Sequence, residues 1–291
     1  MLGRNVSVNS DGNLVSVQNA KKAEKQQNVK EKGSIRASLA ASVAQMAPIP
    51  LSLAGVKGMQ HIAGTLTAEQ KDAMNNTAEQ IIKSTKLAEK GVNIKNISEK
   101  DIINIMPIPD KFADLANPIN AIAHGKNAGF STSNCAELKN TILINKDKLP
   151  TAVFHEIGHA YNYNNSKFWR AMQGARTPAM AVASLIALIP AFTVKEEAKD
   201  GEELTKAQKA KNFVREKSPI LAAAAMLPVV AEESMASIRA AQWVKTNLPK
   251  DLAKKVNKTN ILGAISYVGA TAGMALAAFV GLKVKDKIME K

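Results

Sequence analysis

Long uncharged stretches alternate with short, densely charged segments along this chain. Three of these stretches lie in the C-terminal half, at residues 178–194, 218–231 and 259–282. The last has 24 residues and lysines on both sides, and roughly 20 apolar residues suffice to span a bilayer. We therefore predict a transmembrane helix at 259–282 and a hydrophobic hairpin at 178–231. Alanine-rich helices buried in a soluble core are the alternative for the two shorter runs.

Other segments show the periodicities of ordinary secondary structure. Residues 67–91 carry a partial apolar stripe at helical spacing, and residues 128–132 and 140–145 have the composition of short β-strands that pair with each other. Residues 92–105 show no clear pattern and are predicted to be a connector. Because alanine-rich helical stretches dominate, the expected fold is mainly α with a small β-sheet.

The composition also divides the chain into four parts. We expect a flexible basic tail at 1–36, an apolar segment with prolines at 37–66, a main domain at 67–258, and a C-terminal helix with a basic tail at 259–291.

His155-Glu156-Ile157-Gly158-His159 is a complete HExxH motif. Residues four apart lie on one face of a helix, so both imidazoles can bind one zinc ion. Glu156 then lies beside the metal, where a carboxylate can accept a proton from water. Pro150 suits a first helical turn, and three residues form an apolar stripe: Phe154, Ile157 and Tyr161. Gly158, a poor helix former, indicates that another element packs closely there. A solvated helix turn is the alternative.

A catalytic zinc also needs a third protein ligand. The third histidine of metzincins is excluded, because Asn165 occupies that position. Glu232 and Glu233 lie in a helical stretch that runs to about Lys245. Successive helix positions are about 100° apart, so only one of these two carboxylates can face the metal well. For both of them, a solvated helix start is the alternative.

HEIGHA at 155–160 followed by E-x-x-A at 233–236 resembles the gluzincin zinc metallopeptidases. The resemblance implies a zincin-like catalytic core that holds Zn²⁺ through His155, His159 and Glu233 and hydrolyses peptide bonds with Glu156 as the general base. Ser237 stands where many members carry an aspartate that orients a ligand histidine.

Four further residues have expected places around this centre. Ser237 is expected beside a ligand histidine, and Glu232 is either solvated or hydrogen-bonded to one. Negative charge on the substrate carbonyl oxygen is stabilised by zinc, with help from Tyr161, Tyr163 or a more distant tyrosine. The strand at 140–145 can pair with an extended substrate.

The hydrophobic hairpin between HExxH and the distal glutamate is similar to that of membrane-integral gluzincins, the CAAX prenyl proteases and the heat-shock membrane proteases. This implies a peptide or protein substrate and contact with membrane lipid. The net charge of +14 is spread over tails and segments beside the apolar runs, which suits an anionic membrane surface rather than nucleic acid. Basic residues on the HExxH side favour an active site that faces the cytoplasm. A non-catalytic membrane scaffold with a zincin-like helix is the alternative.

Overall fold

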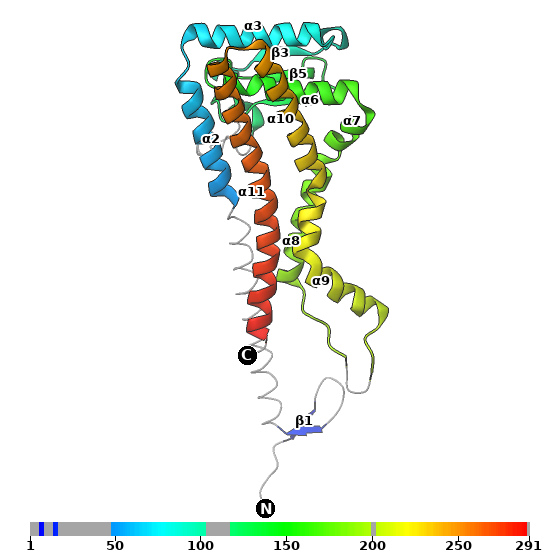
Figure 1. The fold of residues 1–291 in the computed structure, drawn as a ribbon. Coiled ribbons are helices and arrows are strands. Elements are labelled where there is room, and N and C mark those ends of the chain that lie inside the picture. Colours follow the sequence, from blue (N-terminus) through cyan, green and yellow to red (C-terminus); the bar gives the residue numbers. More distant parts are fainter. Residues whose placement is uncertain (1–5, 9–13, 17–47, 103–116, 199–201, 290–291) are drawn as a thin grey trace, which may run out of the picture. The chain divides into compact units, whose positions relative to one another are not determined.

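The computed structural model describes residues 6–8, 14–16, 48–102, 117–198 and 202–289. Within these ranges the protein is mainly helical with a small three-stranded sheet, as the sequence predicts. The predicted tail at 1–36 lies outside the described residues except for two antiparallel strands, β1 (Val6–Val8) and β2 (Leu14–Ser16). The α-helices are α2 (Pro48–Gly64), α3 (Ala68–Ser84), α5 (Pro118–Ala123), α6 (Val153–Asn165), α7 (Lys167–Gly174), α8 (Arg176–Phe192), α9 (Lys206–Ala225), α10 (Leu227–Asn247) and α11 (Lys250–Met289) (Figure 1).

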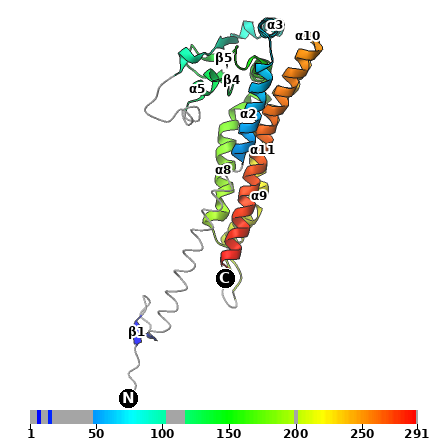
Figure 2. The same cartoon turned by 90° about the vertical axis from the view of Figure 1, so that its left-hand side faces the viewer.

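The three-stranded sheet has the order β3-β5-β4. It is formed by β3 (Asn93–Asn96), β4 (Gly129–Thr132) and β5 (Lys139–Ile144), of which Figure 1 labels β3 and β5 and Figure 2 labels β4 and β5. The antiparallel pairing of β4 with β5 confirms the predicted pair, whereas β3 runs parallel to β5 inside the predicted connector. Three of the four β3 side chains are polar and exposed, so this strand lacks an apolar alternation by which sequence could reveal it.

The central position of β5 corrects one expectation. Both edges of β5 are hydrogen-bonded to neighbouring strands, so an extended substrate cannot pair with residues 140–145. A strand can be added only at the edge of a sheet, and on this side of β5 the edge strand is β4.

The helix predicted at 67–91 is shorter in the structure. The α3 helix begins after Thr67, whose side chain forms a reciprocal capping box with Gln70. It ends at Ser84, and a single 3₁₀ turn follows at Ala88–Lys90. Met74 is fully buried on the inner face of α3, whereas the neighbouring Ala73 is exposed.

The HExxH helix is fixed by the main hydrophobic core. A 3₁₀ turn at Pro150–Ala152 leads into α6, and Phe154 and Ile157 are both completely buried. They join a cluster that draws residues from α3, β5, α10 and the start of α11. Because the apolar side of α6 packs in this core, the polar side of the helix faces α10 in one fixed orientation.

A glycine sets the distance between α6 and α10. A Cβ atom at Gly158 would lie 2.5 Å from the carbonyl oxygen and 2.8 Å from the Cα of Ala236. Real Cβ atoms do not approach backbone this closely, so only glycine allows the contact. Ala236 and Ala240, both fully buried, are the small residues on the facing side of α10. The predicted close packing at Gly158 is confirmed.

The chain forms two compact units. One comprises Pro48–Val182 with Ala225–Ala272 and contains the three-stranded sheet, α6, α10 and the main core. In it α2 lies along the first half of α11, where Gly58 faces Leu262 (Figures 1 and 2). The other comprises Met1–Ala47, Ala183–Ala224 and Gly273–Lys291. In that unit α8, α9 and α11 meet at three buried alanines: Ala187, Ala222 and Ala278.

Among the described residues, two helical segments are long and apolar enough to cross a membrane, Lys206–Asn247 and Lys250–Asp286. The second contains the predicted run 259–282. In the first, the run 218–231 is extended on both sides by α9 and α10, which gives it the length that it lacks alone. The bent pair α7 and α8 is a third candidate if it counts as one span. In the most apolar windows of the two segments only 33% and 28% of the residues are buried. These low values argue against the alternative that the apolar helices are buried in a soluble core.

We expect the full-length protein to sediment with membranes and to resist extraction with alkaline carbonate. Large apolar side chains point outward from the candidate spans, and water solvates such a surface poorly. They include Leu185, Phe192, Ile220, Leu227, Ile261, Val268, Leu276 and Phe279. Fractionation of cell extracts with and without carbonate measures this, and recovery of a detergent-free soluble monomer would contradict it.

Candidate metal centre

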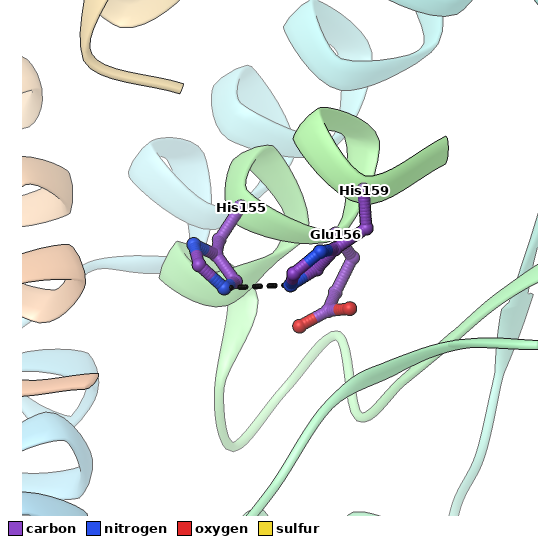
Figure 3. A group of neighbouring side chains, drawn as sticks. All are labelled: His155, Glu156 and His159. Carbon is purple, nitrogen blue, oxygen red and sulfur yellow. Dashed lines mark hydrogen bonds between the residues drawn. The ribbon is translucent and has the colours of Figure 1, made fainter. Parts of the chain in front are cut away.

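Three potential ligand atoms meet between α6 and α10. His155 Nε2 lies 2.9 Å from His159 Nε2 and 2.9 Å from Glu233 Oε2, and His159 Nε2 lies 3.6 Å from the same carboxylate oxygen. Figure 3 shows the two imidazoles projecting from the same side of α6 with their nitrogens facing each other. The structure thus brings together the two histidines of HExxH and the distal glutamate.

These separations fit a small tetrahedral cation. Zinc–ligand distances of 2.0–2.2 Å place neighbouring ligands of a tetrahedral site roughly 3.3–3.6 Å apart. The three observed separations, 2.9, 2.9 and 3.6 Å, lie around this range, so small side-chain movements suffice to accommodate an ion. Two groups of the described residues could hold a metal: His155 with Glu156 and His159, and His159 with Glu232 and Glu233.

The other nitrogen of each imidazole has its own partner on α10. His159 Nδ1 lies 2.7 Å from Glu232 Oε1, and His155 Nδ1 lies 3.1 Å from the Ser237 hydroxyl. Such contacts fix the ring orientation and leave Nε2 as the nitrogen that faces a metal. Of the two alternatives for Glu232, the structure therefore shows the hydrogen bond to a histidine.

The two glutamates of α10 are buried, which excludes a solvated helix start. Glu232 is 0% and Glu233 2% exposed. Burying two adjacent carboxylates is costly unless a cation compensates them. The guanidinium of Arg176, the first residue of α8, supplies that charge by donating from Nη1 to Glu232 Oε2 at 3.2 Å and from Nη2 to Glu233 Oε1.

Tyr267 on α11 completes this side of the centre. Arg176 Nη2 donates to the Tyr267 hydroxyl at 3.5 Å, and the guanidinium carbon lies 5.7 Å from the centroid of the tyrosine ring. The hydroxyl is also close enough to Glu233 to interact with its carboxylate. Tyr267 therefore places a hydrogen-bonding group beside the glutamate that faces the histidines.

The carboxylates also control the charge of His159. Burial by itself lowers the pKa of an imidazole, but the negative charge of Glu233 and the contact with Glu232 outweigh burial and raise the pKa of His159 to about 10. Without a metal, His159 is therefore held in its protonated form at neutral pH. A cation that binds here takes the place of that proton.

Glu156 lies on the same helix between the two histidines. Its side chain is buried, and a carboxylate oxygen lies within 4.8 Å of a ring nitrogen of both His155 and His159. Figure 3 shows this carboxylate extending past the His159 ring. The position suits a group that accepts a proton from a water at the metal centre.

The two tyrosines of α6 have other surroundings. Tyr161 packs edge-on against Trp243, 5.6 Å between ring centroids, and beneath the guanidinium of Arg239. Tyr163 contacts Phe130 and Arg170. Of the three tyrosines in the chain, Tyr267 is the one whose hydroxyl lies beside Arg176 and Glu233.

Sequence reasoning did not find Arg176 or identify Tyr267, although each left a signal. Arg176 is the last charged residue before the uncharged run 178–194, and a buried pair of glutamates requires a counter-cation. Tyr267 is the one tyrosine of the run 259–282, where a hydroxyl in apolar surroundings needs a polar partner.

No family model, no curated protein and no solved structure matches this chain.

Proposed function

We propose that the protein is a zinc-dependent peptidase that acts at a membrane, with a zincin-like catalytic core of the gluzincin type. The observation that carries this proposal is the convergence of His155 Nε2, His159 Nε2 and Glu233 Oε2 within 2.9–3.6 Å of one another. Two imidazoles and one carboxylate are a common ligand set of catalytic zinc, and three protein ligands leave a position open for water.

His155, His159 and Glu233 would hold the zinc ion, which when bound would supply a Lewis acid that polarises a substrate carbonyl and lowers the pKa of water toward neutrality. Glu156 accepts the proton of the attacking water and transfers it to the amine that leaves. Glu232 and Ser237 hold the two imidazoles through their Nδ1 atoms.

Arg176 and Tyr267 support the reaction from the other side. Arg176 binds one oxygen of each glutamate, which keeps Glu233 Oε2 directed at the histidines. The Tyr267 hydroxyl donates a hydrogen bond to the carbonyl oxygen of the substrate as negative charge develops on it. Because Arg176 begins α8 and Tyr267 belongs to α11, two helices with apolar runs contribute to the site.

The substrate is an extended peptide or protein segment near a membrane surface. Because β4 is an edge strand, such a segment can be added to the sheet beside it by β-augmentation. We further propose that this side of the protein faces the cytoplasm, because basic residues beside the spans favour that side and anionic lipids there attract them.

Purified protein in detergent tests the proposal. We expect about one zinc ion per chain and hydrolysis of unfolded casein that stops on addition of a chelator and returns with zinc. Stoichiometric zinc without hydrolysis would support the alternative function, a membrane scaffold with a zincin-like helix. Hydrolysis that is insensitive to the chelator would contradict zinc catalysis.

A further inference from the structure

Unsatisfied polar atoms gather on one turn of α11. Among the described residues, five buried side-chain polar atoms have no hydrogen-bond partner, and three of them belong to Asn257 and Asn260. Asn260 is only 6% exposed, and both its amide nitrogen and its amide oxygen are unpartnered. Buried amides without partners are rare because desolvation costs free energy, and they call for an explanation.

Asn260 lies on the same face of α11 as Tyr267. Residues 260, 263 and 267 are spaced by three and four, so they share one face of the helix. The outward face of α11 lies elsewhere and carries Ile261, Ile265 and Val268. The amide of Asn260 is thus directed to the side of α11 from which Tyr267 reaches Arg176 and Glu233.

There is open space on this face between the amide and the tyrosine. A Cβ atom added at Gly263 would meet nothing within 4 Å, and Gly263 is partly accessible. By contrast, Gly55 and Gly58 of α2 pack directly against α11 at Ser266 and Leu262. The strip of α11 from Asn260 to Tyr267 therefore has unfilled space beside Gly263, and the buried, unpartnered amide of Asn260 lies at one end of it.

We infer that this strip binds the main chain of the substrate and that the Asn260 amide pairs with one of its peptide groups. A free amide offers one acceptor and one donor, which complements the N–H and C=O of a peptide. Tyr267 and Asn260 are seven residues apart, or roughly 10 Å along the helix, which is about the length of three residues of extended chain. The amide thus contacts the substrate about three residues from the bond that is cleaved. The inference rests on the proposed peptidase function.

Asn260→Leu tests this, because leucine has a similar size but no hydrogen-bonding groups. We expect the KM for unfolded casein to rise about tenfold or more, since a substrate peptide group is left unpaired. The melting temperature should stay unchanged or rise, because the amide has no partner to lose, and zinc content should stay the same. Gly263→Leu fills the open space and should also raise KM without lowering the melting temperature.

Thr259→Val is the matched control. Thr259 is buried on the same turn, but its hydroxyl donates to Lys255 O within the helix, so KM should not change. An unchanged KM in Asn260→Leu would overturn the inference. A fall in the melting temperature of this variant would also overturn it, because that result would mean that a structural water satisfies the amide.

A binding assay separates this inference from the proposed catalysis. Fluorescein-labelled casein peptides are titrated with the Glu156→Gln protein, and fluorescence polarisation is measured with and without Asn260→Leu. If the wild type does not hydrolyse casein but Asn260→Leu still weakens binding, the site binds peptides and the proposed catalysis fails. If the wild type hydrolyses casein and Asn260→Leu neither weakens binding nor raises KM, catalysis stands and the inference fails.

Discussion

Glu156→Gln should abolish peptide hydrolysis while zinc remains bound. Glu156 lies beside both histidines but is not one of the three groups whose atoms converge most closely. Glutamine has the same shape and cannot accept a proton, so we expect a loss of at least about 10²-fold in kcat, the usual scale for removal of a general base. Rates of casein hydrolysis together with zinc content measure both parts of the expectation.

Glu89→Gln is the matched control, because Glu89 is an exposed glutamate on the 3₁₀ turn after α3. Its turnover should equal that of the wild type. Near-normal turnover by Glu156→Gln would show that another group accepts the proton and that the proposed mechanism is wrong.

Glu233→Gln should lose zinc, whereas Glu232→Gln should retain it. The oxygen of Glu233 lies 2.9 Å from His155 Nε2, and that of Glu232 lies 2.7 Å from His159 Nδ1, the ring nitrogen that is not part of the converging cluster. A neutral amide is a poor zinc ligand but still accepts a hydrogen bond from an imidazole. Loss of an outer partner typically costs about 10–100-fold in metal affinity. We expect Glu232→Gln to stay within that range and Glu233→Gln to exceed it.

Competition with a calibrated zinc chelator measures these affinities. The two variants control for each other's effect on folding, because each replaces a carboxylate that contacts Arg176 with an amide of the same shape. A larger loss of affinity in Glu232→Gln would place the third ligand one residue earlier. Equal, small losses in both variants would remove the glutamates from the metal centre.

The parts of the centre that are local in sequence could be predicted. The i, i+4 spacing of His155 and His159 fixes them on one face of α6, and the glycine at 158 indicates close packing that the structure shows against Ala236. The 100° between Glu232 and Glu233 separates their directions, and they contact different nitrogens. Each of these features could be predicted because it depends on helix geometry and on residues that are close together in the sequence.

Relations that depend on tertiary packing could not be predicted. Arg176 lies 56 residues before Glu232, and Tyr267 lies 91 residues after Arg176, so no local periodicity links them. The β3 strand was missed because polar, exposed side chains dominate it. The central place of β5 depends on that missed strand, and this is why the predicted pairing of residues 140–145 with substrate was wrong.

The most direct test of the account is metal analysis of the purified wild type beside His159→Ala. His159 contributes Nε2 to the cluster of ligand atoms and Nδ1 to Glu232, so its loss removes one of three protein ligands. We expect about one zinc per chain in the wild type and almost none in His159→Ala after dialysis against zinc-free buffer. Equal metal content in the two proteins, or no zinc in either after reconstitution, would contradict the proposed zinc centre.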